Sequence, residues 1–361
     1  MIAARTVEPC PAGDLRIVDI DPLADPRWSA LLRLEAAGLF HAPPWLRALT
    51  DAYGFVPRAY LAVDPQGLPQ GGIAYCKLAD ALGPRVLSLP FSDACDPLLA
   101  SGQAWPALLA AVQAHGVPLH LRCLDEPAPA ADSQLTVAKR ARWHTLALGA
   151  GLDAVWSGFE GGARRAIRKA ERAGVVVRPL TSPTAVEDFR RLHVTLRKRK
   201  YRLLAQPPAF FEAIARRFGE IDGWFPLGAF VGDRLVAATI YLRWGHTLYY
   251  KFNASCLDAL DERPNNLLVW AGIALAHSLD CRKLDLGPSD DDQPGLIRFK
   301  RQFGAAEREL KFLRYVPPGW RDDRAAELRT LLGELTRTLT APDVPEEVAG
   351  NAGALLYRLF A

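Results

Sequence analysis

A lysine at position 300 lies among apolar side chains in the segment GLIRFKRQFGA, residues 295–305. A helix over this segment places Lys300 on the same side as Leu296 and Phe303, at 100° per residue. A cation held against apolar groups is costly unless it reaches a carboxylate, a substrate oxygen or solvent. Two interpretations of Lys300 stay open: a buried functional amine, or a lysine that extends past the edge of the core into water.

Asp285 lies in the strand-like segment KLDLGPSD, just before the loop GPSDDDQPG at 287–295. Ligands of α/β sheets usually bind at the carboxyl ends of strands, so Asp285 is a candidate site residue. The aspartates at 290–292 lack the spacing of a calcium loop and have no histidine nearby, and we predict no metal site there. Instead, we expect Asp292 to cap the helix that carries Lys300.

The segment TLYYKFNAS, residues 247–255, has the alternation of a strand. Strict alternation places Tyr249, Lys251 and Asn253 on one face, which is too polar for a core. This face is either the solvated side of the strand or the lining of a cleft for a substrate, and we choose these three residues as candidates for that lining.

One segment of the chain carries a large excess of positive charge. Residues 161–202 hold thirteen Lys and Arg against Glu171, Glu187 and Asp188, a local charge of +10 within a net charge of +4. Such a block is often only a solvated helix face, but it also suits a phosphate or another polyanion. Arg168, Arg197 and Arg199 are the candidates for that contact. No RNA-binding motif accompanies them.

Composition excludes several classes of protein. With 361 residues and 50% apolar content, the chain can bury a full core and favours two domains. The six cysteines, Cys10 among them, form no CxxC pair, which argues against structural zinc and against a disulfide framework. No apolar run approaches the roughly 18 residues of a membrane span, and the N-terminus lacks a signal-like segment. We expect a cytoplasmic protein without a transmembrane segment.

One pattern of segments occurs twice along the chain. A proline-initiated helix and a strand meander occupy 41–93 and recur over 206–255. An apolar helix and a strand follow each meander, at 103–125 and at 265–290. Even the closing segments are similar, at 138–148 and 299–316. This order predicts two tandem α/β (α+β) units, each with a mixed, mostly antiparallel sheet flanked by helices; one large twisted sheet is the alternative.

The glycine-rich run at 149–151 marks the expected boundary between the units. The predicted domains are therefore residues 1–150 and 151–318, and the last segment, 319–361, is expected to form helices that pack back on one of the units.

Several motifs together resemble the Fem-type (FemAB-like) peptidyltransferases and their BioF2-like acetyltransferase relatives in the GNAT superfamily. They span nearly the whole chain: HAPPWL, RRAIRKAERAGVVV, DFRRLHVTLRKR, VGDRLVAATIYLRW, LYYKFNAS, LDLGPS and FKRQFGA. The resemblance implies a tandem GNAT fold and an acyltransferase that modifies an amine of a cell-envelope or polysaccharide precursor. It also implies that Lys300, with Asp285 nearby, lies at the transferase centre and stabilises the oxyanion.

The resemblance leaves the donor open between acyl-CoA, which we favour, and aminoacyl-tRNA, as in enzymes of the peptidoglycan bridge. No tightly bound cofactor is expected. The segment DERPNNLLVW lacks the glycine that usually lets backbone N–H groups approach a pyrophosphate. Peripheral contact with an anionic lipid-linked precursor is a further expectation, and a non-catalytic module that binds anions is the rival class.

Overall fold

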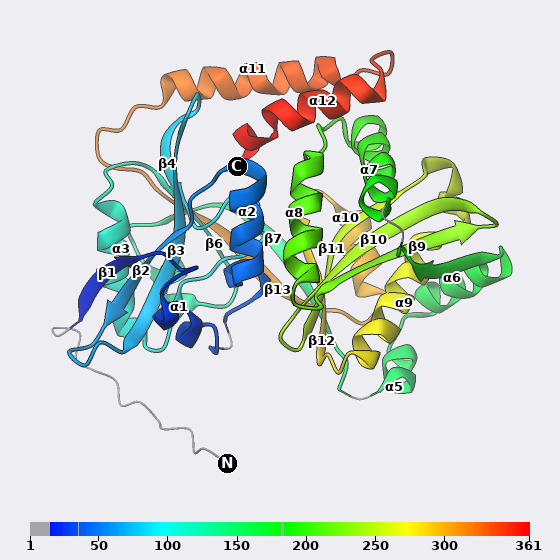
Figure 1. The fold of residues 1–361 in the computed structure, drawn as a ribbon, viewed down its shortest axis with the longest axis horizontal. Helices are drawn as coiled ribbons and strands as arrows, with labels where there is room; N and C mark the ends of the chain where they lie inside the picture. Colours follow the sequence, from blue (N-terminus) through cyan, green and yellow to red (C-terminus); the bar gives the residue numbers. More distant parts are fainter. Residues whose placement is uncertain (1–14, 35, 150, 182–183) are drawn as a thin grey trace.

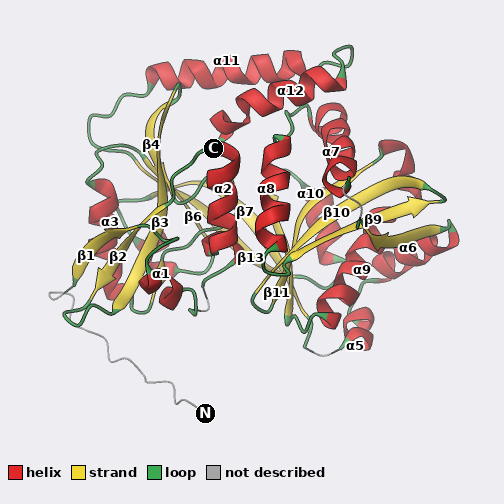
Figure 2. Ribbon diagram, viewed as in Figure 1, coloured by secondary structure: helices red, strands yellow, loops and turns green. Residues whose placement is uncertain are grey.

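The structure is a computed structural model that describes residues 15–34, 36–149, 151–181 and 184–361. Cys10 and Ala150 lie outside the described residues. Two α/β units lie side by side, and helices α2 (Pro43–Tyr53) and α8 (Pro208–Gly219) pack against each other between them (Figure 1). Figure 2 shows that each unit has a sheet with helices against it.

The first unit begins with an antiparallel meander. Its strands are β1 (Arg16–Ile20), β2 (Arg58–Val63), β3 (Pro69–Asp80) and β4 (Gly83–Leu87), and the short β5 (Leu98–Leu99) pairs with β3. Strand β6 (Leu119–Cys123) then lies parallel to β4. The helices besides α2 are α1 (Pro26–Leu31), α3 (Trp105–Gln113) and α4 (Pro127–Ala131).

The second unit repeats this order. Its antiparallel strands are β8 (Val175–Pro179), β9 (Trp224–Val231), β10 (Arg234–Trp244) and β11 (Thr247–Ser255), and β12 (Lys283–Asp290) lies parallel to β11. Its helices besides α8 are α5 (Leu152–Ser157), α6 (Gly161–Arg172), α7 (Ala185–Leu196), α9 (Pro264–Ser278) and α10 (Pro294–Arg301). The predicted duplication is confirmed. The sequence analysis had not anticipated β1 and β8.

The closing strands of the two units are exchanged. Strand β7 (Thr136–Ala147) follows the first unit in sequence but pairs with β12 of the second. Strand β13 (Ala306–Tyr315) follows the second unit but pairs with β6 of the first, and β7 and β13 pair with each other. The described strands thus form one continuous sheet. The chain therefore has both features that the sequence left as alternatives, two similar units and one large sheet. The domain boundary at 149–151 stays a prediction.

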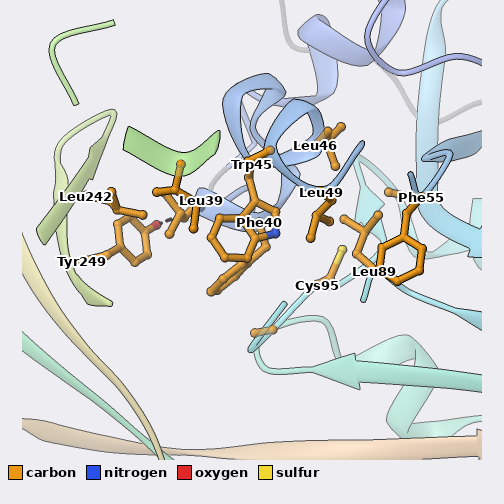
Figure 3. Close-up of a cluster of buried hydrophobic side chains, with 14 of the residues drawn as sticks. Leu39, Phe40, Trp45, Leu46, Leu49, Phe55, Leu89, Cys95, Leu242 and Tyr249 are labelled. Atoms are coloured by element: carbon orange, nitrogen blue, oxygen red, sulfur yellow. Dashed lines mark hydrogen bonds between the residues drawn. The ribbon is translucent and has the colours of Figure 1, made fainter. Parts of the chain in front are cut away.

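The central core joins the two units through their proline-initiated helices. Helix α2 starts at Pro43, where a missing N–H costs nothing, and ends at Gly54 with a left-handed φ of 68°. Its Trp45 and Leu49 are fully buried. Figure 3 shows these side chains in a row with Leu242 and Tyr249 from the second unit. The interface between the units is therefore a hydrophobic core and not a hinge.

Two further helices lie across both units at the top of Figure 1, α11 (Asp323–Leu339) and α12 (Glu346–Leu356). They are held by the basic segment after α7. The Lys198 ammonium donates to the Pro342 carbonyl at 3.3 Å, and Arg199 pairs with Glu346 at 2.8 Å. None of the helices in the described residues is both long enough and apolar enough to cross a membrane.

Candidate functional site

Lys300 does not extend into solvent. It lies near the end of α10 with only 4% of its surface exposed, and its ammonium donates to the carbonyls of Gly287 at 3.0 Å and Pro288 at 2.7 Å. Burial lowers the pKa of Lys300 to about 7, although the carboxylates of Asp285 and Asp93 favour its charged form. The amine thus titrates near neutral pH, which is a property of groups that take part in proton transfer.

Asp285 is buried on β12, close to the residues that hold Lys300. Its carboxylate accepts hydrogen bonds from the Trp143 indole at 3.0 Å and from the Gly287 N–H at 2.8 Å. Burial raises the pKa of Asp285 to about 6, against these hydrogen bonds. Gly287 has a φ of 67°, and this left-handed turn lets the strand direct one peptide N–H to Asp285 and its carbonyl to Lys300.

A bulge in β11 separates the three residues that we expected on one face. The register against β10 shifts so that Tyr250 and Phe252 have consecutive partners, and Lys251 is the extra residue. The alternation therefore changes face at Lys251. Tyr249 lines a cavity between the units, whereas Asn253 lines another cavity within the second unit. The prediction of a single polar face is wrong, because an extra residue shifts a period of two by one.

Lys251 has a structural environment. Its ammonium pairs with Asp93 of the first unit at 2.5 Å and lies about 5 Å from the ring centres of Phe40 and Trp45, at 4.9 and 5.2 Å. Its side chain is 7% exposed. Lys251 thus connects the two units by a partly buried ion pair beside aromatic rings.

Asn253 belongs to a polar network on the wall of a cavity of about 430 Å³. Its amide donates to Thr239 Oγ1 at 2.9 Å and to Asn265 Oδ1 at 3.1 Å, and Asn265 in turn donates to Ser255 at 3.3 Å. Leu296 and Phe299 of α10 form an apolar side of the same cavity. The cavity therefore combines fixed polar groups with an apolar wall, which is typical of small-molecule sites.

A second cavity, of about 460 Å³, is strongly cationic. Arg165 and Lys169 of α6 line it together with Arg263 and Arg298. Within the described residues, none of these four cations has a carboxylate at ion-pair distance. An anion is the natural ligand of such an uncompensated cluster.

The first turns of three helices add to this positive potential. Gly162, Asn266 and Gly295 line the cationic cavity, and they lie in the first turns of α6, α9 and α10. The N-terminus of a helix presents free N–H groups and a partial positive charge. Arg263 has a left-handed φ of 60° at the start of α9. The chain therefore makes this turn although the segment contains no glycine.

The cationic cavity and the cavity of Asn253 meet at Gly295 and Phe299, which line both. Lys300 follows Phe299 directly but is in the lining of neither cavity. The sequence analysis did not select Arg263, Arg298 or Asn265. A partial signal was present, since Arg263 and Asn265 lie at the start of α9, but Arg298 lies in the last turn of α10, and only the fold brings α6, α9 and α10 together.

A third cavity, of about 190 Å³, lies between the units. Tyr249 and Asp285 line it from the second unit, and Asp96 lines it from the first. Burial raises the pKa of Asp96 to about 7, although three backbone N–H groups donate to its carboxylate. Lys283 and Arg308 line the same cavity, so its wall carries charges of both signs.

The three predicted arginines are not in these cavities. Arg168 is exposed on α6, with its guanidinium 5.8 Å from the ring centre of Trp156. Arg197 donates to the Leu204 carbonyl at 2.6 Å, and Arg199 pairs with Glu346. Arg197, Lys198 and Arg199 thus hold neighbouring chain segments, whereas Lys200 of the same segment lines the cavity of Asn253. Their role in substrate binding stays a prediction.

The acidic loop also has a structural use. Asp290 pairs with Lys139 at 2.7 Å and Asp291 with Arg142 at 3.1 Å, both on β7. The expected cap by Asp292 is wrong: Gln293 is the N-cap residue, without a side-chain cap hydrogen bond. Pro294 lacks an N–H, so less remains for a cap to satisfy. In the described part of the chain, no group of three or more His, Cys, Asp or Glu could hold a metal ion.

Comparison with known proteins agrees with this geometry. Residues 158–301 match the family described as acetyltransferase (GNAT) domain, a segment that includes α6, α9 and most of α10 with Lys300. A search of curated protein sequences gave no match.

Solved structures share the whole fold at low sequence identity. FemX is 12% identical with a TM-score of 0.58, over 84% of this chain and 97% of FemX. L-PGS from Bacillus licheniformis is 15% identical with a TM-score of 0.54, over 86% and 97%. A tandem GNAT protein from the clavulanic acid biosynthesis pathway is 14% identical with a TM-score of 0.54, over 85% and 100%.

These likenesses extend over both units, whereas the family match covers the part of the chain that forms the two adjoining cavities. The resemblance inferred from the sequence motifs is thereby confirmed. Residues 158–301 match the acetyltransferase (GNAT) domain family, and the fold of the chain as a whole is similar to the folds of FemX, L-PGS and the tandem GNAT protein.

Proposed function

We propose that the protein is an N-acyltransferase that moves an acyl group from acyl-CoA to an amine of a cell-envelope or polysaccharide precursor. The observation that carries the proposal is the junction at Gly295 and Phe299 between a cationic cavity and a partly apolar one. A donor of this kind joins a polyanionic end to a thioester end, and the two cavities match this division.

The cationic cavity suits the phosphate groups of the donor. Arg263 and Arg298 would bind phosphate oxygens with charge-assisted hydrogen bonds, supported by the N–H groups of the first turns of α9 and α10. The thioester end would then extend past Phe299 toward Asn253 and Asn265. The amide groups of these two residues are fixed by the network with Thr239 and Ser255, so they can orient a polar ligand without rearranging.

The cavity between the units suits the acceptor. An amine arrives as an ammonium, and Asp96 and Asp285 offer it two buried carboxyl groups. In the reaction a C–N bond forms and the C–S bond of the thioester breaks. The ammonium loses two protons, of which one joins the departing sulfur and the other passes to solvent. Groups that titrate near neutral pH, such as Asp285 and Lys300, are suited to exchange these protons or to neutralise an oxyanion.

Aminoacyl-tRNA is the alternative donor, and one feature favours it. The exposed face of α6 continues the cationic cavity with Arg168 and Arg172, beyond what a CoA molecule needs. A non-catalytic anion-binding module would use the same surface. An enzyme that uses acyl-CoA, an enzyme that uses aminoacyl-tRNA and a non-catalytic module differ in the ligand that they bind, and only the two enzymes would need Lys300 for activity.

The test measures binding and product formation separately. Acetyl-CoA, CoA and charged tRNA are each added to the purified protein in a thermal-shift titration, because a ligand of the folded state raises its melting temperature. We expect acetyl-CoA to stabilise the wild type, and Arg263→Gln and Arg298→Gln to weaken its binding about tenfold each. Arg140→Gln is the matched control, since Arg140 of β7 is an exposed cation that pairs with Glu309 of β13.

Product formation then separates an enzyme from a binder. Lys300→Ala should bind acetyl-CoA as the wild type does and lose at least about 100-fold in the rate of amine acylation. Stabilisation by charged tRNA alone would assign the donor to aminoacyl-tRNA. Binding of any polyanion with equal strength, without acylation of any amine tested, would overturn the proposal in favour of an anion-binding module.

A further inference from the structure

A cavity in the first unit lies apart from the site described above. It encloses about 380 Å³ between β4, β6 and β13 and is covered by α11 and the last residues of the chain. In Figure 1 this region lies at the upper left, below α11, whereas the GNAT-type domain lies on the right. Its lining is mainly leucine and phenylalanine, interrupted by His120, Arg122 and Arg85.

Arg122 is the unusual member of this lining. Its guanidinium donates to the Ser92 carbonyl at 2.5 Å and lies 5.6 Å from the ring centre of Phe312. Among the described residues, no carboxylate lies at ion-pair distance from Arg122, whereas Arg85 in the same cavity pairs with Asp80 at 2.8 Å. Burial lowers the pKa of Arg122, although the charge of Asp93 raises it, and the residue lies half-buried at the wall of the cavity.

The other ionisable groups around the cavity add little net positive charge. Burial lowers the pKa of His120 to about 4, and nearby arginines, first Arg314 and then Arg85, Arg329 and Arg122, lower it further. Arg329 comes from α11 and pairs with Asp322 at 3.0 Å. His120 is therefore neutral at pH 7, and Arg122 is the cation that a ligand could neutralise.

The duplicated topology gives this arrangement a counterpart. Strands β4 and β6 pair in parallel up to Leu87 and His120, and Arg122 is two residues further along β6. In the second unit, β11 and β12 pair in parallel up to Tyr249 and Asp285, and two residues further is Gly287, whose carbonyl binds Lys300. Gly287 of β12 therefore corresponds to Arg122 of β6, and each unit places a cation next to this point of its sheet, Lys300 from α10 in one case and Arg122 itself in the other.

We propose that this cavity is a second ligand site, which binds an amphiphile with an anionic head group and a hydrocarbon chain. The head group, a carboxylate or a phosphate, contacts Arg122 between β4 and β6. The chain fills the space among Leu87, Leu89, Phe312 and Leu332, whose side chains offer no hydrogen bond. A volume of about 380 Å³ is within the usual range for small-molecule sites.

The test uses decanoate, decyl phosphate, decanol and decyltrimethylammonium as probes in calorimetric titrations below their micellar concentrations. We expect saturable binding of decanoate or decyl phosphate, at least about tenfold weaker binding of decanol, and none of the cationic probe. The two anionic probes distinguish a carboxylate ligand from a phosphate ligand. These titrations use the full chain of the wild-type protein.

Two variants locate the binding. Arg122→Gln removes the cation. Leu332→Trp fills the cavity from α11 and leaves Arg122 in the sequence. Each variant should weaken anion binding at least about tenfold. Arg140→Gln and Lys300→Ala should bind as the wild type does. If Arg122→Gln does not fold, Leu332→Trp and the comparison with decanol still decide. Equal binding of decanol, unchanged binding in Leu332→Trp, or no binding of either anion would overturn the proposal.

Discussion

At the scale of single residues, the buried amine of Lys300 is the main departure from an ordinary surface lysine. The residue has three N–H donors, and two backbone carbonyls use two of them. In the proposed reaction, the third donor of the charged form would be available to a substrate atom. A lysine fixed in this way loses its rotamer freedom on folding, so no further side-chain entropy would be lost when a substrate binds.

The titration of Lys300 should be visible in stability. A lysine in the unfolded chain titrates near 10.5, and burial lowers the pKa of Lys300 to about 7 in the folded protein. Between these values the unfolded chain binds more protons, so the stability contributed by this residue rises with pH. We therefore expect the difference in unfolding free energy, wild type minus Lys300→Met, to rise by about 1 kcal/mol per pH unit between pH 7.5 and 9.5.

Urea unfolding of both proteins at pH 7.5, 8.5 and 9.5 measures this difference. Groups that both proteins share cancel in the subtraction, including the buried cysteines. The two carbonyls left without a donor shift the variant by a constant amount and do not change the slope. A difference that stays flat over this range would mean that Lys300 titrates like an exposed lysine.

At the scale of elements, the sequence predicted which segments form helices and strands better than it predicted where their side chains point. Proline-initiated helices and Val-, Ile- and Tyr-rich strands are local signals, and α2, α8, β10 and β11 formed where these signals stand. The bulge at Lys251 has no local signal, because it depends on the register between β10 and β11. Its effect is large: one extra residue sends Tyr249 and Asn253 to different cavities.

The cationic cavity illustrates a second limit of local signals. Arg263 and Arg298 are 35 positions apart in sequence and come together only because α9 and α10 begin on the same side of the sheet. The density of charge in 161–202 drew attention to Arg197 and Arg199 instead. Arg197 instead donates to the Leu204 carbonyl, and Arg199 pairs with Glu346 of α12, because the density of charge in a segment does not say where its side chains point.

Close packing of α9 on β10 gives a prediction at this scale. A Cβ added at Gly272 would lie 2.3 Å from the ring of Tyr241, which is fully buried and donates its hydroxyl to the Leu268 carbonyl at 2.9 Å. The ring cannot move without losing this bond. Gly272→Ala should therefore destabilise the protein by about 1–3 kcal/mol despite the better helix propensity of alanine.

Gly333→Ala is the matched control for this prediction. Gly333 lies within α11, and a Cβ there would meet nothing within 4 Å. This substitution should stabilise the protein by about 0.5–1 kcal/mol, because glycine loses more backbone freedom on folding than alanine. Chemical denaturation of both variants measures the effects. A Gly272→Ala protein as stable as the Gly333→Ala protein would show that the α9 contact with Tyr241 is loose.

At the scale of the whole molecule, the exchange of β7 and β13 couples the two units. Each unit completes its sheet with a strand that belongs in sequence to the other, and the two exchanged strands pair along most of their length. The partly buried pair of Lys251 and Asp93 adds a polar link across the same interface. A boundary at 149–151 can be cut in sequence, but a cut there leaves each half with a strand that has lost its partners.

This coupling predicts that the chain unfolds as one unit. Loss of β13 would expose the edge of β6 and the apolar side chains of Leu119 and Leu121, which are fully buried in the intact protein. Residues 15–150 and 151–361, expressed separately, should therefore lack cooperative unfolding, and should regain it when both are refolded together. In the intact chain, circular dichroism and tryptophan fluorescence should report one coincident transition, and the amides of β7 and β13 should open in hydrogen exchange with the same free energy. Two separate transitions, or a first half that unfolds cooperatively alone, would mean that the exchanged strands add little and that the units are independent domains joined by a linker at 149–151.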